Sequence, residues 1–209
     1  ASCDWSSDVC SFRSVMRNGR RDPDHEWGTN PCSEIILRPF QFCNLSEIVV
    51  RAEDTLETLK EKTKVATILG TLQSTLVSFR YLRPIWKKNT EEECLLGVSM
   101  TGIRDNAVMS GRVKPDPAKW GGHKELTGIL EELKQFAIFT NTIWAKDLRI
   151  NPSAAITCCK PSGTVSQLVN SASGIHPRHS AYYIRTVRAD NKDPLALYMQ
   201  EKGFPCEVD

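Results

Sequence analysis

The chain has 209 residues, of which 40% are hydrophobic and 25% are charged, and its formal net charge is +2. This composition is typical of a globular protein with a sizeable core and excludes a disordered segment. The charge is too balanced to indicate a nucleic-acid surface, and no apolar stretch approaches the ~20 residues that a membrane helix needs. We therefore expect neither nucleic acid nor a membrane as a partner.

The cysteines, eight in all, do not follow the CxxC spacing of zinc ribbons and fingers. A chain of this size also has no need of a disulfide framework to hold a small core together. We therefore expect reduced cysteines without a bound metal, most of them in the core and one or two with a chemical role. Reduced cysteines in turn indicate a cytoplasmic protein.

Residues 1–15 show neither helical nor strand periodicity and differ in character from the remainder of the chain. They contain acidic residues and lack the apolar region of a signal peptide, so we expect no secretion signal. We interpret 1–15 as a foreign segment of artefactual origin and assign no function to Cys3 or Cys10. The domain itself is expected over 16–209, beginning with a polar loop over 16–30.

After this loop the chain alternates strand and helix patterns. β-Branched or buried runs predict strands, and apolar residues at helical spacing predict helices with a buried face. The expected strands are 34–38, 44–51, 94–103, 154–159 and 181–188, and the expected helices are 55–79, 126–148 and 194–202. Residues 104–122 are rich in Gly and Pro and predict a loop. Strands that alternate with long helices indicate an α/β fold with parallel strands.

Local signals mark the ends of the expected helices. Asp54 and Glu57 have the spacing of a capping box before the first helix, and Pro84 is expected to end it. Pro194 at the first position and Gly203 just after the end frame the last helix.

Asn30, Cys32 and Glu34 alternate in a proline-containing segment. If the segment is extended, the three side chains project to one side and place a thiol, a carboxylate and an amide around one small ligand. The carboxylate could act as a general base and the amide could fix a hydroxyl. Negative charge beside a thiol disfavours the thiolate, so a one-electron role fits Cys32 better than ordinary nucleophilic chemistry. From these residues alone, the alternative is a core cysteine beside a chance glutamate.

A predicted strand, a glycine turn and a helix start come one after another at the sequence KPSGTVS. Gly163 permits a close backbone approach, and free N–H groups with the Ser162 and Thr164 hydroxyls could bind an anion. The GxxxxGK pattern is absent, which excludes a Walker loop. The alternative is a capped helix after a tight turn. Lys160 could add charge to this site or be solvated, and Cys158-Cys159 is interpreted as core packing.

Several separated stretches resemble ribonucleotide reductases, in the right order along the chain. Asn30-Pro31-Cys32-Ser33-Glu34-Ile35 followed by Phe42-Cys43-Asn44-Leu45 is similar to the finger loop and the next strand of these enzymes. Residues 27–54 resemble the adenosylcobalamin-dependent (class II) ribonucleoside-triphosphate reductases most closely. The other matching stretches are 97–103, 160–164, 174–177 and 183–188. The resemblance covers 16–209.

This resemblance implies a role for each matching residue. Cys32 would carry a thiyl radical that abstracts the 3′-hydrogen of the ribose, Glu34 would take the 3′-hydroxyl proton, and Asn30 would hydrogen-bond the substrate hydroxyls. Cys43 would be one of two cysteines that close to a disulfide as the 2′-hydroxyl leaves as water, and we expect its partner to be absent from this chain. The residues implied in substrate binding are Ser33, Pro161, Ser162, Gly163, Thr164 and Val165.

The resemblance also implies the C-terminal part of the ten-stranded α/β barrel of this family, with its central finger loop. It implies adenosylcobalamin as cofactor, a ribonucleoside triphosphate as substrate and a thioredoxin-like reductant as partner. Because family members are several times longer, we expect a fragment of the catalytic barrel that is inactive alone. The alternatives are a class I large subunit, a non-catalytic nucleotide-binding module and a thiol-rich metal-binding protein.

Overall fold

The computed structural model describes residues 21, 24–184 and 186–207. The segment 1–15, with Cys3 and Cys10, lies outside them, so its foreign origin stays a prediction. The chain divides into two compact units, Ala1–Arg178 and His179–Asp209, which are described separately. None of the described helices is long and apolar enough to cross a membrane.

A parallel pair of strands forms the centre of the first unit. β3 (Asn44–Val49) pairs with β4 (Leu96–Thr101) in parallel, with Asn44 opposite Leu96 and Val49 opposite Thr101. The parallel pair confirms the expected α/β class. Both strands are shorter than the sequence patterns predicted.

Residues 154–158 run along the edge of β4 that faces away from β3. The Val98 N–H donates to the Ile156 carbonyl (2.8 Å), and the Cys158 N–H donates to the Val98 carbonyl (3.0 Å). Regular pairing is limited to one parallel bridge, between Val98 and Thr157. The predicted strand 154–159 is therefore wrong as a full strand, although its backbone direction and its neighbour are those of a parallel sheet.

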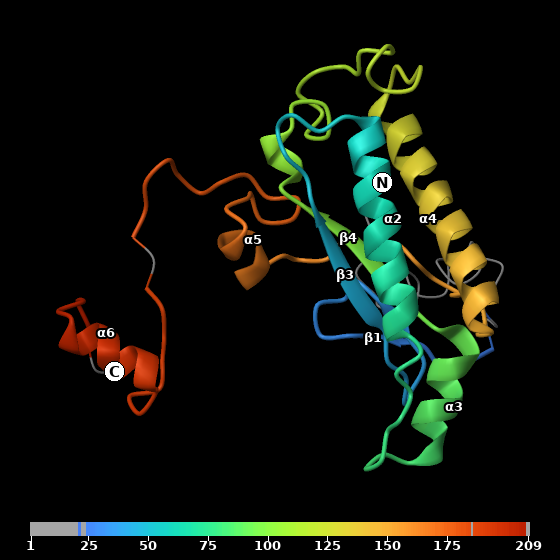
Figure 1. The fold of residues 1–209 in the computed structure, drawn as a ribbon, viewed down its shortest axis with the longest axis horizontal. Helices are drawn as coiled ribbons and strands as arrows, with labels where there is room; N and C mark the ends of the chain where they lie inside the picture. Colours follow the sequence, from blue (N-terminus) through green and yellow to red (C-terminus); the bar gives the residue numbers. More distant parts are fainter. Residues whose placement is uncertain (1–20, 22–23, 185, 208–209) are drawn as a thin grey trace. The chain divides into compact units, whose positions relative to one another are not determined.

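Two long helices cover one face of the sheet. Figure 1 shows α2 (Leu56–Gln73) and α4 (Leu126–Leu148) side by side against β3 and β4. Leu59 and Ile129 meet at one end of this interface, and Leu96 and Ala137 meet further along it. Full burial of a side chain such as Leu96 contributes about 1.5–3 kcal/mol to folding. The bounds of α4 are those that the sequence predicted.

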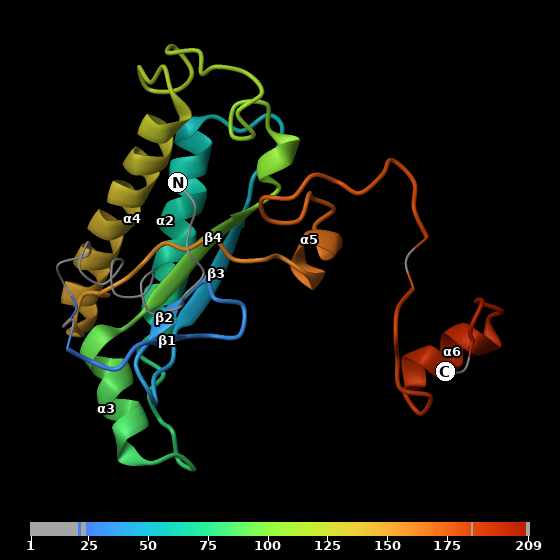
Figure 2. The same ribbon diagram turned by 180° about the vertical axis from the view of Figure 1, so that it is seen from behind.

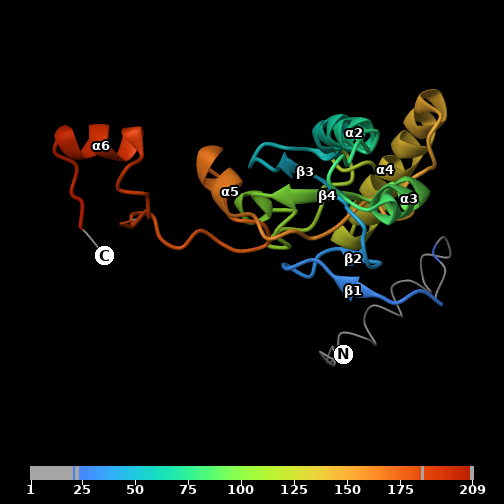
Figure 3. The same cartoon turned by 90° about the horizontal axis from the view of Figure 1, so that it is seen from below.

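A short hairpin lies on the opposite face. β1 (Gly28–Thr29) pairs antiparallel with β2 (Ile36–Leu37). Figures 2 and 3 show this hairpin on the side of β3 and β4 away from α2. Ile35, in the turn just before β2, is buried against Leu95 and Ala154. The predicted strand 34–38 is thus confirmed only at its centre.

The first predicted helix is too long, and a helix after it was missed. α2 ends at Gln73, because the hydroxyls of Ser74 and Thr75 bond back to carbonyls of the last turn (both 2.7 Å) and the chain turns away. Pro84 does not end a helix but begins one, α3 (Pro84–Glu93). Proline is favoured at a first helical position, since its missing N–H has no partner there in any case.

The predicted capping box lies one residue later than expected. Thr55 is the capping residue of α2, and its N–H donates to the hydroxyl of Thr58 (3.0 Å), not to Glu57. The Asp54 carboxylate instead accepts from the Arg51 N–H (2.7 Å) and closes the preceding turn.

The long loop after β4 is present as predicted. It opens with a short 3₁₀ turn, η1 (Ile103–Asp105), and contains no other regular element up to Leu126 within the described chain. Asn106 organises it: its amide donates to the Arg51 carbonyl (3.0 Å), and its oxygen accepts from the Val108 N–H (2.9 Å). One buried side chain therefore fixes the loop to the turn before α2.

The second unit contains α6 (Pro194–Glu201). Pro194 occupies its first turn, the Asp193 carboxylate accepts from the Leu195 N–H (2.7 Å), and Gly203 adopts a φ of +80° after its end. The start is as predicted, and the helix ends one residue before the predicted Lys202. The predicted strand 181–188 is wrong for its described residues, because no neighbouring strand exists in the described part of this unit to pair with it.

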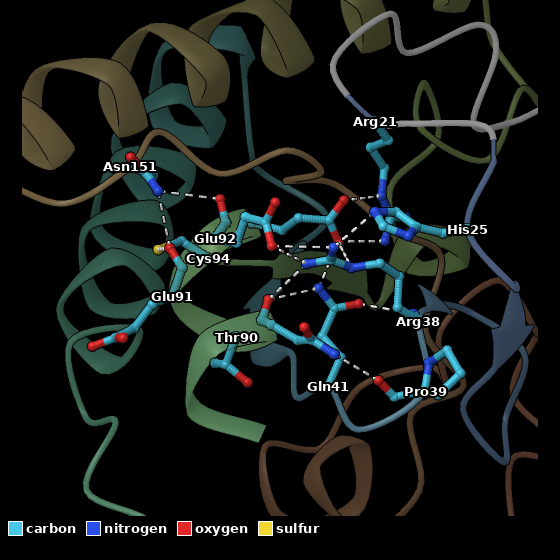
Figure 4. A network of polar contacts seen from close by, with 12 residues as sticks. Arg21, His25, Arg38, Pro39, Gln41, Thr90, Glu91, Glu92, Cys94 and Asn151 are labelled. Carbon is cyan, nitrogen blue, oxygen red and sulfur yellow. Dashed lines mark hydrogen bonds and ion pairs between the residues drawn. The ribbon is translucent and has the colours of Figure 1, made fainter. Parts of the chain in front are cut away.

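A buried ion-pair network fastens the hairpin to α3. Two guanidinium nitrogens of Arg21 donate to the Glu93 carboxylate (2.8 and 2.9 Å). The third donates to the Ile36 carbonyl of β2 (2.9 Å). Arg38, just after β2, pairs with Glu92 (3.2 Å) and lies 3.5 Å from Glu93. Figure 4 shows how these side chains converge.

Glu93 is the carboxylate at the centre of this network, and only 8% of its side chain is exposed. Burial alone would raise the pKa of Glu93. Hydrogen bonds from Arg21 and Gln41 and the positive charges of Arg21 and Arg38 outweigh that effect, so the pKa of Glu93 lies below its ordinary value. The network therefore stabilises the fold only while Glu93 is ionised.

We predict that Glu93→Gln lowers the free energy of unfolding by about 3–5 kcal/mol, because it leaves buried arginines without their counter-charge. The effect depends on pH. Since the pKa of Glu93 is lower in the folded state, its contribution is present above the ordinary glutamate pKa and is lost as the pH falls through the folded value. Urea unfolding at neutral and acid pH measures both effects.

The matched control is Glu131→Gln on the exposed face of α4, which should leave the unfolding midpoint nearly unchanged. A loss of stability from Glu93→Gln that is equally large in acid would contradict the assignment.

Candidate active site

Cys32 lies at the tip of the β1–β2 hairpin. The Ser33 N–H donates to the Asn30 carbonyl (2.9 Å), and Ser33 adopts a left-handed φ of 60°. The Ile35 N–H donates to the side-chain oxygen of Asn30 (3.0 Å), and the Asn30 N–H donates to the Ile35 carbonyl (3.1 Å). The segment is thus a tight turn and not extended as expected, and Cys32 is exposed on it.

The turn sends Glu34 in a different direction from Cys32. The Glu34 side chain is 1% exposed, and neither carboxylate oxygen has a hydrogen-bond partner among the described residues. The Lys160 ammonium lies 3.9 Å from one of these oxygens. Burying a carboxylate with both oxygens unsatisfied costs folding free energy. This cost indicates that Glu34 has a role other than packing.

Two half-buried thiols share this environment. Burial raises the pKa of the Cys43 thiol, and the charge of Glu34 raises it further, while the charge of Lys160 opposes. Burial, then the charge of Glu34, raises the pKa of Cys158 to about 12. Both sulfurs are therefore neutral thiols at physiological pH. Gly97 makes room for the side chains packed over it, because a Cβ there would clash with Leu45 and would lie 2.9 Å from Ile35 and 3.1 Å from the Cys158 sulfur.

The KPSGTVS segment forms a turn that leads into α5 (Thr164–Leu168), with Gly163 as its capping residue. The Lys160 N–H donates to the Ser99 hydroxyl on β4 (3.0 Å). The Ser162 hydroxyl donates to Glu47 on β3 (3.0 Å). The turn is therefore fastened to both strands of the sheet, and the Ser162 hydroxyl is already engaged.

The structure brings together only part of the predicted site. Glu34 and Cys43 share one environment with two residues that sequence reasoning gave no role there, Lys160 and Cys158. Cys32 and Asn30 lie in the same hairpin turn as Glu34. The remaining predicted residues form the hairpin turn or the turn before α5: Ser33, Pro161, Ser162, Gly163, Thr164 and Val165.

Sequence reasoning also missed Glu47. Its even spacing from Cys43 along β3 places it on the same face, which was a usable signal. One of its oxygens accepts from Ser162, and the other is buried without a hydrogen-bond partner among the described residues.

The cysteines do not form a metal site in the described part of the chain. No group of three or more potential ligands gathers there. The six described cysteines are free thiols, and Cys94 is deep in the core, where burial raises its pKa. The thiol-rich metal-binding alternative required converging cysteines, so it loses its support among these residues.

The comparisons with known proteins point to one family of enzymes. The chain is 31% identical to the adenosylcobalamin-dependent ribonucleoside-triphosphate reductase of Lacticaseibacillus paracasei, over 92% of the chain and 27% of that protein. It is 32% identical to the enzyme of the same name from Lactobacillus acidophilus, over 90% of the chain and 27% of that protein. No protein-family model matches the chain.

A solved structure agrees with these relatives. The fold matches the crystal structure of a B12-dependent (class II) ribonucleotide reductase with a TM-score of 0.62 and 26% identity, over 89% of the chain and 28% of that structure. The chain thus spans about a quarter of the length of the proteins that it matches. The chain is a relative of the adenosylcobalamin-dependent ribonucleoside-triphosphate reductases and corresponds to one segment of them, as its sequence motifs predicted.

Proposed function

We propose that this chain supplies part of the active site of an adenosylcobalamin-dependent ribonucleotide reductase. In the complete polypeptide it would reduce ribonucleoside triphosphates to 2′-deoxyribonucleotides. The observation that carries this proposal is the buried Glu34 carboxylate, whose two oxygens lack hydrogen-bond partners among the described residues, beside two neutral thiols. Such a carboxylate is ready to accept a hydrogen bond from a substrate hydroxyl.

The protonation state of the thiols favours radical chemistry over nucleophilic attack. A cysteine nucleophile needs a lowered pKa, whereas burial and Glu34 raise the pKa of Cys43. A neutral thiol instead keeps the hydrogen that it must give up in a reduction. Glu34 is therefore better suited to act on a hydroxyl group than to activate a neighbouring cysteine.

Each residue would then have a defined part in the reaction. A thiyl radical on Cys32 would remove the 3′-hydrogen of the ribose and return it at the end. Glu34 would take the 3′-hydroxyl proton, and the Asn30 amide N–H groups would orient the substrate hydroxyls. Cys43 and a second thiol would supply two electrons and two protons, so that the 2′-hydroxyl leaves as water and a disulfide forms. A thioredoxin-like reductant would then restore the two thiols.

The residues present are compatible with adenosylcobalamin. Cys32 is exposed at the tip of a hairpin, where a cofactor held by other parts of the polypeptide could reach it. When bound, the cofactor would supply the radical, and the protein would position it. A class I large subunit, the main alternative, would obtain its radical from a partner protein. The relatives are named as cobalamin-dependent enzymes, which favours class II.

Cys158 does not fit the part of the second thiol. Cys43 precedes β3, and Cys158 lies on the segment beyond β4, so the two are separated by an intervening strand. Two strand spacings amount to about 9–10 Å, whereas cysteines in a disulfide have Cα atoms about 4.4–6.8 Å apart. The partner of Cys43 is therefore expected outside the described residues.

Phosphate binding by the turn at 161–165 rests on the resemblance. α5 has five residues, which is too short for a strong dipole, and the Ser162 hydroxyl is engaged with Glu47. The donors left for phosphates are the Thr164 hydroxyl and backbone N–H groups near Gly163. A non-catalytic nucleotide-binding module would use the same turn, but it gives no reason to keep Glu34 buried without a hydrogen bond.

We further propose that the sheet continues into the barrel of this family. The outer edge of β3 has no partner strand among the described residues. A groove of about 780 Å³ runs along this edge and is lined by β3 and α2. Val65 and Leu69 line this groove and are largely exposed, contrary to the buried face predicted for 55–79. A neighbouring barrel strand and its helix would cover both. A cytoplasmic setting stays a prediction.

We predict that Cys32→Ser abolishes ribonucleotide reduction by the complete polypeptide, because a hydroxyl does not form the required radical under these conditions. Deoxyribonucleotide formation is measured with adenosylcobalamin and a dithiol, without a second subunit. Cys206→Ser, an exposed cysteine of the second unit, is the control and should keep activity within about twofold. Cobalamin-independent activity of the unaltered protein would overturn the class II assignment.

We predict that Val65→Lys lowers the free energy of unfolding of the complete polypeptide by about 2 kcal/mol or more, because a charge would enter a covered apolar contact. Val113→Lys is a matched control, since Val113 is 55% exposed and Val65 is 57% exposed. Equal and small effects of the two substitutions would mean that nothing covers this face of α2.

A further inference from the structure

Lys160 is the one cation within ion-pair distance of Glu34 among the described residues. Its ammonium lies 3.9 Å from a Glu34 oxygen. The two side chains differ in burial, because Lys160 is 30% exposed and Glu34 is 1% exposed. The Lys160 side chain thus extends from a partly exposed position toward the Glu34 carboxylate, which is shielded from water.

The backbone of Lys160 is fixed independently of this contact. Its N–H donates to the Ser99 hydroxyl on β4 (3.0 Å). Its carbonyl lies against Gly174, where a Cβ would come within 3.2 Å of the oxygen. Gly174 also has a left-handed φ of +54°. A side chain there is disfavoured both by this backbone conformation and by the close carbonyl. The backbone of Lys160 is therefore held in place. Its flexible side chain needs to span only a short distance to reach Glu34.

We propose that Lys160 is a positioning residue that orients the Glu34 carboxylate as its counter-charge, and that it thereby joins the 161–165 turn to the general base. This inference rests on the function proposed above. It differs from the two uses considered from the sequence, a charge for substrate phosphates and a solvated side chain.

The physical reason is the cost of burying Glu34. A carboxylate without hydrogen bonds and without a counter-charge is strongly disfavoured in the interior. Lys160 opposes this without occupying the carboxylate, since 3.9 Å is longer than a hydrogen bond and leaves both oxygens open to substrate.

The two thiols offer a readout that does not depend on turnover. The negative charge of Glu34 raises the pKa of Cys43 and of Cys158, and the positive charge of Lys160 lowers both. If Lys160 faces Glu34, removing either charge shifts the thiols in opposite directions. If Lys160 faces solvent, its removal leaves them unchanged.

The first test is the kcat and KM of ribonucleotide reduction by the complete polypeptide. Lys160→Met should lower kcat by about tenfold or more and leave KM nearly unchanged, because the buried carboxylate has lost the counter-charge that orients it. Lys160→Arg should restore most of the activity. Lys119→Met, on the exposed loop, is the matched control and should behave as the unaltered protein. An unchanged kcat for Lys160→Met would overturn the proposal, and so would a change in KM alone, which indicates phosphate binding.

The second test is alkylation of Cys43 by iodoacetamide, quantified site by site in the same polypeptide. Glu34→Gln should speed it and Lys160→Met should slow it, each by about threefold or more, and the double variant should return toward the unaltered rate. Identical rates for Lys160→Met and Lys119→Met would refute the pairing. Because this readout needs no turnover, it separates a failure of the pairing from a failure of the proposed enzymatic function.

Discussion

Segments far apart in the sequence converge on the single carboxylate of Glu93. Arg21 reaches it from before the hairpin, Arg38 and Gln41 reach it from the chain between β2 and β3, and Glu93 itself ends α3. Because these charges are buried, each depends on the others, and none can be removed without leaving an uncompensated partner. The hairpin has only two residues in each strand, too few to hold it in place by backbone pairing. Its position on the sheet, and with it the position of Cys32, therefore depends on this ionised cluster.

The two faces of the sheet serve different purposes. The face toward α2 and α4 is apolar and supplies most of the burial, through residues such as Leu96 and Val98. The other face carries the polar and thiol groups, among them Cys43 just before β3 and Glu47 on β3. Since side chains alternate along a strand, one strand can build the core with one set of residues and the site with the other. Gly97 completes this division, because its missing side chain leaves space for Cys158 over the centre of β4.

Sequence patterns predicted the elements that depend on local signals and failed where tertiary contacts decide. The helix 126–148 was predicted to the residue because its apolar spacing is continuous. α3 was missed because Pro84 signals both an end and a beginning, and only the structure distinguishes them. Asn30, Cys32 and Glu34 lie in one turn, but the shared direction predicted for their side chains was wrong, because the left-handed Ser33 turns the chain between Cys32 and Glu34. Nothing in the sequence near Glu34 points to Lys160, since only the tertiary fold brings these two distant residues together.

The turn at 160–165 lies between two carboxylates that it engages in different ways. Lys160 at its start faces Glu34 at 3.9 Å, and Ser162 two residues on donates a hydrogen bond to Glu47 at 3.0 Å. Neither carboxylate is fully satisfied, since each keeps at least one buried oxygen without a hydrogen bond among the described residues. Negative charge on this side would repel a phosphate placed directly between them. If the turn binds a nucleotide as proposed, its phosphates would therefore point toward Thr164 and its ribose toward Glu34, which is the orientation that the proposed ribose chemistry at the Cys32 hairpin requires.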